Sequence, residues 1–144
     1  FRKQLALAEE LELPVVLHSR EAEADTLDLL REHPPSRKGV AHSFTGTRQM
    51  AEELLAMGWY LGFNGIVTFK NVEELRQVVR SVPLPRMLLE TDAPYLSPVP
   101  FRGRPNAPCR VSLIADYVAG LLEISVEQLA RQTSQNAEEL FGLS

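Results

Sequence analysis

Residues 13–42 read LPVVLHSREAEADTLDLLREHPPSRKGVAH, and this stretch decides the fold. It begins with a short apolar run that ends at His18 and continues with helical periodicity over residues 22–33. After the helix-breaking segment PPSRKG, a second apolar run ends at His42. An apolar run, an amphipathic helix and another apolar run together predict a βαβ unit, which is the building block of a parallel sheet.

The same alternation continues on both sides of this stretch. The first dozen residues place apolar side chains at helical spacing. Further along, Thr47 opens a helix that Gly58 closes, and the run WYLGF follows as a strand. Asn71 with Glu74 predicts a capping box for the next helix, after which PLP leads into the strand MLLE. The unit therefore repeats along the chain.

These repeats predict a parallel sheet in which each strand is joined to the next by a right-handed crossover. The strands are apolar without alternation, which indicates burial on both faces and an α/β class. From Val111 onward the pattern predicts two further helices, the second capped by Ser125 with Gln128. The four strands are expected near residues 14–18, 39–42, 59–64 and 87–92.

Composition narrows the function classes. The 144-residue chain has a formal net charge of −4 and a pI near 5.4, so it lacks the basic surface typical of nucleic-acid binding, and any contact with DNA must be local. No apolar run approaches the about 20 residues of a membrane span, so no membrane segment is expected. The single cysteine, Cys109, excludes an intramolecular disulfide and a thiolate zinc cluster, which fits a cytoplasmic location.

Each predicted strand ends at a polar residue: His18, His42, Asn64 and Asp92. Taken singly, a histidine after an apolar run is more often structural, and an aspartate before Ala-Pro is often a turn former. Together they suggest a site, because two of the three histidines occupy equivalent places in consecutive βα units, at the strand ends that carry the chemistry of such folds. The third, His33, ends a helix before proline and is expected to be structural.

Imidazole and carboxylate together suit divalent ions such as Zn²⁺ or Mn²⁺, whereas Mg²⁺ prefers oxygen ligands. Three protein ligands leave a position open for water, and activation of that water makes hydrolysis the expected chemistry. The proline-rich segment 94–108 follows the last strand closely and is expected to be a functional loop.

Five segments carry a family resemblance: LPVVLHSREA at 13–22, GVAHSFTG at 39–46, YLGFNGIVTF at 60–69, LLETDAPYLSP at 88–98 and QTSQNAEELFGL at 132–143. They resemble the signature of the TatD family of metal-dependent deoxyribonucleases, in the amidohydrolase superfamily. The resemblance implies a (β/α)₈ TIM-type barrel, which needs roughly 250 residues. We therefore expect residues 1–144 to be a partial barrel domain, the C-terminal half with about four βα units, and the N-terminal half to be absent.

The resemblance also implies an activity: divalent-metal-dependent cleavage of the phosphodiester bonds of DNA, often from the 3′ end. Matching the motifs makes His18, His42 and Asp92 metal ligands for Mg, Mn or Zn, with two ions in the complete enzyme. Asp92 would also orient or deprotonate the attacking water, and Glu90 would support the site from behind the ligands. The residues expected at the substrate are Arg20, Asn64, Arg102 and Arg104.

The chain also departs from the family pattern. The family's His-x-His motif and its bridging glutamate are not in this chain, so the binuclear site is expected to be incomplete. The loop has Asn106, Ala107 and Pro108 where the family usually has Asn-Glu-Pro. Two alternatives stay open: a superfamily hydrolase acting on an amide or lactone, or a non-catalytic half-barrel. Unpaired sheet edges would favour self-association.

Overall fold

The structure is a computed structural model that describes residues 1–143. Its centre is one parallel sheet in which the strands pair in chain order, β1-β2-β3-β4. Each strand lies inside the range expected from the sequence, and the α/β class is confirmed. The strands are β1 (Val16–Leu17), β2 (Val40–Ala41), β3 (Tyr60–Phe63) and β4 (Met87–Leu89).

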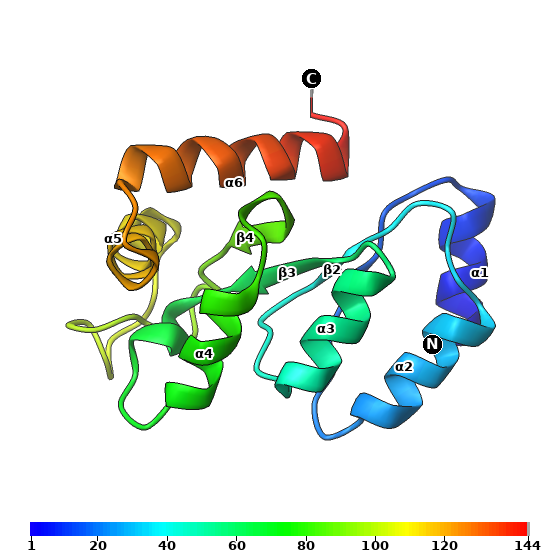
Figure 1. Ribbon diagram of the computed structural model, residues 1–144, viewed down its shortest axis with the longest axis horizontal. Coiled ribbons are helices and arrows are strands. Elements are labelled where there is room, and N and C mark those ends of the chain that lie inside the picture. Colours follow the sequence, from blue (N-terminus) through cyan, green and yellow to red (C-terminus); the bar gives the residue numbers. More distant parts are fainter. Residues whose placement is uncertain (144) are drawn as a thin grey trace.

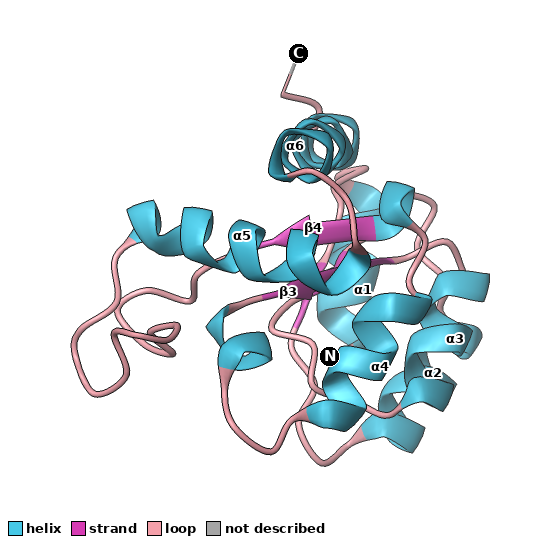
Figure 2. Ribbon diagram, turned by 60° about the vertical axis from the view of Figure 1, so that its left-hand side comes forward, coloured by secondary structure: helices cyan, strands magenta, loops and turns pink. Residues whose placement is uncertain are grey.

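Helices cover the sheet unevenly. Helices α2, α3 and α4 pack next to one another on one side of the sheet, and α6 lies across the opposite side (Figures 1 and 2). The helices are α1 (Arg2–Glu10), α2 (Glu23–Glu32), α3 (Arg48–Ala56), α4 (Glu73–Ser81), α5 (Val111–Leu122) and α6 (Val126–Phe141). Short 3₁₀ helices are η1 (Gly65–Thr68), η2 (Leu84–Arg86) and η3 (Pro108–Arg110). No helix within residues 1–143 is long and apolar enough to cross a membrane.

Alternate residues of each strand contact different layers. Leu17, Leu61 and Met87 belong to the main core, which also takes in buried side chains of the helices. Val40 and Leu88 belong to a second, smaller cluster on the other face, together with Tyr60 and Leu140 of α6. Burying one such aliphatic side chain contributes about 1.5–3 kcal/mol. The second face is therefore covered at one end by α6, and the residues that follow Val40 and Leu88 at the other end, His42 and Glu90, continue along it.

Helix α6 is fixed to the sheet by a buried asparagine. The Asn136 amide donates hydrogen bonds of 2.8 Å to the carbonyl oxygens of both Leu84 and Met87, and its side chain is fully buried. The Leu84 carbonyl also accepts from the backbone amide of Met87. Asn136 therefore gives that carbonyl a second donor, and it supplies a donor to the Met87 carbonyl in the core, where an unpaired acceptor is costly. The contact joins the last helix to the strand that leads into the predicted site.

The helix caps match the sequence at three places and differ at one. Thr47 Oγ1 accepts from the Met50 amide, Ser125 Oγ accepts from the Gln128 amide, and Gly58 ends α3 with a φ of 85°. The capping box predicted at Asn71 was wrong. Asn71 has a left-handed backbone with a φ of 59°, because asparagine tolerates that conformation and forms a turn there instead. Helix α4 begins at Glu73, and the residue before it, Val72, provides no side-chain cap.

Candidate functional site

The polar residues that follow β1, β2 and β4 come together at the C-terminal ends of the parallel strands. The ring centroids of His18 and His42 lie 5.8 Å apart. His42 Nε2 lies 3.5 Å from Asp92 Oδ1, and both side chains are about 70% shielded from solvent, with exposed fractions of 28% and 30%. The grouping expected from the strand ends is thus present in the structure.

Glu90 controls the orientation of the His42 ring. Its Oε1 atom lies 2.8 Å from His42 Nδ1 and accepts a 2.5 Å hydrogen bond from the Ser43 amide. When Nδ1 donates to a carboxylate, the other ring nitrogen carries a free lone pair. The Nε2 atom that faces Asp92 is therefore the one prepared to bind a metal ion.

Gly62 makes room for this carboxylate. A Cβ atom at position 62 would lie 2.6 Å from Glu90 Oε2, closer than side chains tolerate. Sequence analysis did not identify Gly62 as a site residue. The available signal was a glycine inside a fully buried strand, which often marks a close approach from a neighbouring element.

Two site residues have left-handed backbone conformations. Ser43 has a φ of 50° and Asp92 a φ of 57°. Such a conformation costs a non-glycine residue on the order of 1–3 kcal/mol and persists where surrounding contacts hold it. Ser43 is held on two sides, since its amide donates to Glu90 and its Oγ accepts a 2.7 Å hydrogen bond from Asn64 Nδ2.

Asn64 lies behind the site. Its side chain is 4% exposed, with Nδ2 bound to Ser43 Oγ and Oδ1 accepting a 3.0 Å hydrogen bond from the Ile66 amide. Both ends of the amide are therefore engaged within the protein. In this structure Asn64 positions Ser43 and begins η1, whereas the sequence analysis had expected it at the substrate.

The three arginines expected at the substrate lie on two different segments. Arg20 is exposed and follows His18 by two residues. Arg102 and Arg104 are exposed on the 94–108 loop, and the Arg102 guanidinium lies over the Phe69 ring at 3.6 Å from its centroid. The structure thus brings Arg102 near the end of η1, while Arg20 stays beside β1 at the opposite end of the strand order.

The 94–108 loop is tied to the strand end by Asn106, which is 7% exposed. Its side-chain Nδ2 atom donates to the carbonyl oxygens of Thr91 at 2.7 Å and Tyr95 at 2.8 Å. Its backbone amide donates to the Pro94 carbonyl at 2.9 Å. Sequence analysis noted only the difference from the family beside this residue. The structure shows that Asn106 holds the loop against the segment that carries Asp92.

The donor set fits a divalent metal ion. Two atoms that bind one ion at about 2.1 Å each lie about 3 to 3.5 Å apart at common coordination angles. The 3.5 Å separation of His42 Nε2 and Asp92 Oδ1 is of that size. Among residues 1–143, however, no three His, Cys, Asp or Glu side chains close into a complete metal cluster. His42 and Asp92 form a pair, with the exposed His18 ring beside it.

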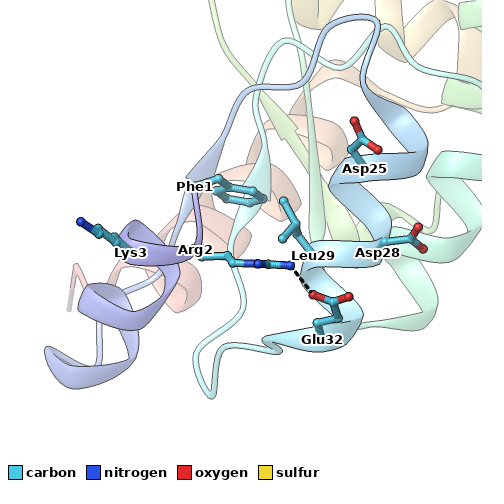
Figure 3. A pocket seen from close by; sticks show the side chains of 7 residues that line it. All are labelled: Phe1, Arg2, Lys3, Asp25, Asp28, Leu29 and Glu32. Carbon is cyan, nitrogen blue, oxygen red and sulfur yellow. Dashed lines mark hydrogen bonds and ion pairs between the residues drawn. The ribbon is translucent and has the colours of Figure 1, made fainter.

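The site borders a groove along the free edge of β1. This groove, with a volume of about 400 Å³, is lined by α1, the segment before β1, and β1 itself, and it ends at His18. Its lining includes the exposed apolar side chains Leu11, Leu13 and Val16. A separate cavity of about 640 Å³ between α1 and α2 is crossed by an Arg2–Glu32 ion pair of 2.9 Å, and none of the site residues lines it (Figure 3).

Comparisons with curated proteins place these features in context. A protein of Escherichia coli K12 named "Uncharacterized metal-dependent hydrolase YcfH" is 48% identical over 142 residues, covering 98% of this chain and 54% of that protein. The Bacillus subtilis protein "Uncharacterized metal-dependent hydrolase YabD" is 42% identical over 145 residues, covering 100% and 57%. The "3'-5' ssDNA/RNA exonuclease TatD" of Erwinia amylovora is 46% identical over 149 residues, covering 99% and 58%. The chain spans about half the length of these relatives.

Solved structures agree on the fold. The crystal structure of YJJV, a TatD homologue from Escherichia coli K12, has a TM-score of 0.92 and 34% identity, covering 97% of this chain and 54% of that one. A TatD-family hydrolase from Entamoeba histolytica has a TM-score of 0.86 at 23% identity, which supports the fold alone. These neighbours are TIM barrels, so the four βα units form half of a (β/α)₈ barrel, as expected from the sequence.

The family assignment rests on the whole length of the chain. The model of the family described as "TatD related DNase" matches residues 1–142, which include every strand, every helix and all the site residues described above. The chain belongs to the TatD-related DNase family.

Proposed function

We propose that this chain contributes the His18, His42 and Asp92 side of a divalent-metal-dependent hydrolase that cleaves phosphodiester bonds of DNA from the 3′ end. One observation carries the proposal: His42 Nε2 faces Asp92 Oδ1 at 3.5 Å while Glu90 holds the opposite ring nitrogen. A histidine oriented by a carboxylate is the usual arrangement of a metal ligand. The name of the Erwinia amylovora relative, a 3'-5' ssDNA/RNA exonuclease, supports this substrate class.

Each site residue has a separate task in this proposal. His18 and His42 bind the ion as neutral imidazoles, and Asp92 binds it as a carboxylate. Asp92 would also orient the attacking water and accept its proton. Glu90 keeps the His42 ring in place. The ion itself supplies Lewis-acid activation of water and neutralises charge on the phosphate. The donor set suits Zn²⁺ or Mn²⁺ better than Mg²⁺.

Recognition of DNA would rely on local charge. The chain has a net charge of −4, so the phosphate backbone is not attracted by the molecule as a whole. Arg102 and Arg104 on the 94–108 loop provide positive charge on one side of the site, and Arg20 provides it on the other. Asn64 contributes indirectly, through its hydrogen bond to Ser43.

The sheet of this half-barrel would pair with further strands at its β1 edge. Within residues 1–143 the outer side of β1 has no neighbour in the sheet, and Val16 on that strand is 59% exposed. An unpaired strand edge with apolar neighbours favours pairing with another chain or segment. We propose that the β1 edge pairs with the remaining strands of a complete barrel, or with a second copy of the chain when those strands are missing.

Metal binding provides the direct test. Calorimetric titration of the chain with Zn²⁺ and Mn²⁺ should show binding that His42→Ala and Asp92→Asn each weaken at least about tenfold. His33→Ala is the matched control, because this exposed histidine ends α2 and lies outside the site. Turnover is measured on 3′-labelled single-stranded DNA, with the chain alone and mixed with the N-terminal half of the YcfH relative. Metal affinity that is equal in His42→Ala and His33→Ala, with no metal-dependent turnover in the mixture, would favour a non-catalytic half-barrel.

A further inference from the structure

The Tyr95 side chain is largely exposed to solvent. Its side chain is 71% accessible, the largest value among the exposed large hydrophobic residues of the described chain. An aromatic side chain in that position gains nothing from burial, and scattered exposed apolar groups need no explanation by themselves. The exposure of Tyr95 is relevant because this residue lies close in the chain to Asp92 of the candidate site.

A tight turn places Tyr95 beside the candidate metal site. The Tyr95 amide donates a 2.8 Å hydrogen bond to the carbonyl oxygen of Asp92, which closes a four-residue turn. The ends of such a turn lie less than about 7 Å apart. The Tyr95 ring is therefore attached to the backbone one turn away from the carboxylate that faces His42 Nε2.

The backbone that presents Tyr95 is held firmly. The Asn106 side chain binds the carbonyl oxygens of Tyr95 and Thr91, one on each side of Asp92. Further along the loop, Ser97 Oγ donates a 2.6 Å hydrogen bond to the Arg104 carbonyl, and an Arg110 guanidinium nitrogen lies 3.1 Å from Ser97 Oγ. A fixed backbone reduces the conformational entropy that an aromatic ring loses when it binds a flat ligand.

The same loop supplies positive charge. Arg102 and Arg104 are both exposed on it, and Arg102 is kept in place over the Phe69 ring. A loop that carries an exposed aromatic ring and exposed cationic side chains suits single-stranded nucleic acid, since bases stack on aromatic rings and phosphates contact cations. Stacking also adds affinity without net positive charge, which this chain lacks.

We propose that the Tyr95 ring is the stacking platform for the terminal base of a single-stranded DNA substrate, next to the phosphate that is cleaved. The inference rests on the proposed nuclease function and deepens it by naming a residue that recognises the base. Because every base has a flat face, the platform accepts all four bases and selects for an unpaired end.

The test measures stacking in the absence of turnover. An oligodeoxythymidine with a 3′-terminal 2-aminopurine is titrated with the chain in EDTA at low salt, and fluorescence quenching gives the affinity. Tyr95→Leu removes the aromatic face but keeps an apolar side chain, and it should weaken binding about 5- to 100-fold. Tyr95→Phe keeps the ring and should bind within about twofold of the original chain.

Two controls separate stacking from other effects. Tyr117→Leu changes a tyrosine on α5, which is 37% exposed and lies under Arg76, and it should leave the affinity unchanged. An oligonucleotide whose terminal nucleotide is abasic, measured by its competition with the 2-aminopurine oligonucleotide, should bind the original chain and Tyr95→Leu equally. If Tyr95→Leu binds the 2-aminopurine oligonucleotide as tightly as the original chain, or loses the same affinity for the abasic one, the stacking role is wrong while the nuclease proposal stands. If the original chain binds neither oligonucleotide and shows no metal-dependent turnover after mixing with the YcfH half, both proposals fail.

Discussion

The Oε1 atom of Glu90 lies 2.8 Å from Nδ1 of His42, so a residue of β4's end orients a residue that follows β2. The contact passes over β3, the strand between them, at Gly62. Three strands are thus needed to fix one imidazole. We therefore expect that substitutions of residues that do not bind the metal ion will change the affinity of the chain for that ion.

Glu90→Gln should weaken Zn²⁺ or Mn²⁺ binding by about 10- to 100-fold. The negative charge of Glu90 fixes the His42 ring and makes this ligand more basic, and the substitution removes that charge. Calorimetric titration of the chain measures the effect. Glu74→Gln, at the exposed start of α4, is the matched control and should bind metal as before. Unchanged affinity in Glu90→Gln would show that the His42 orientation does not matter for binding.

Gly62→Ala should damage the site through Glu90. The new methyl group would lie 2.6 Å from Glu90 Oε2, so either the carboxylate moves or the strands separate. We expect a loss of about 1–3 kcal/mol in the free energy of unfolding, together with weaker metal binding. Gly120→Ala on α5 is the control: no atom lies within 4 Å of the added group, and this change should stabilise the helix by about 0.5–1 kcal/mol. Urea denaturation of both variants decides the comparison.

Asp92→Asn should reduce phosphodiester hydrolysis by at least about 10²-fold in the completed barrel, because the amide is a poorer ligand and cannot accept a proton from water. Affinity for DNA should fall much less. Asparagine tolerates the left-handed backbone of position 92, so the substitution tests chemistry without adding backbone strain. Initial rates at saturating Mn²⁺ provide the measurement, and near-normal turnover there would remove Asp92 from the mechanism.

Asn136→Ala should destabilise the fold without touching the site. It removes the side-chain donor to the carbonyl oxygens of Leu84 and Met87. The Leu84 carbonyl keeps the backbone amide of Met87 as a donor, so we expect a loss of about 1–3 kcal/mol in the free energy of unfolding. Gln135→Ala, the exposed neighbour on the same helix, should change the free energy of unfolding by less than about 0.5 kcal/mol. Equal stability of the two variants in urea would show that the α6 contact contributes little.

The chain by itself should bind divalent metal weakly, hydrolyse DNA poorly or not at all, and self-associate. Within residues 1–143 no complete metal cluster forms, and the β1 edge exposes Leu11, Leu13 and Val16. Sizing chromatography with light scattering measures the association, and a nuclease assay in excess Mn²⁺ or Zn²⁺ measures turnover. A monomer with turnover equal to that of a full-length relative would contradict both parts.

The strands and the strand-end residues could be predicted because their signals are local. Apolar runs alternate with helical periodicity, and His18, His42 and Asp92 stand directly after three such runs. Parallel pairing then brings equivalent positions to one edge without further information. The family resemblance added the role of Glu90, which no local pattern indicates.

The contacts that hold the site and α6 in place could not be predicted, since they join distant parts of the chain. The fit of Glu90 against Gly62 depends on strand register, and the bonds of Asn106 and Asn136 depend on where loop and helix return to the sheet. Asn64 ends a predicted strand and was expected at the substrate, yet its neighbours in space engage both ends of its amide. The cap at Asn71 was wrong because turn and cap signals share the same residue type.

The buried Asn136 contact also bears on the order in which a growing chain matures on the ribosome. Strands β1 to β4 pair in chain order, so each can join its predecessor as it emerges, and an N-terminal part can fold first. The Met87 carbonyl nevertheless receives its side-chain donor only from α6. Docking of α6 therefore completes the strand that leads into Asp92, and a product that stops before α6 lacks this hydrogen bond and is left open to quality-control proteases.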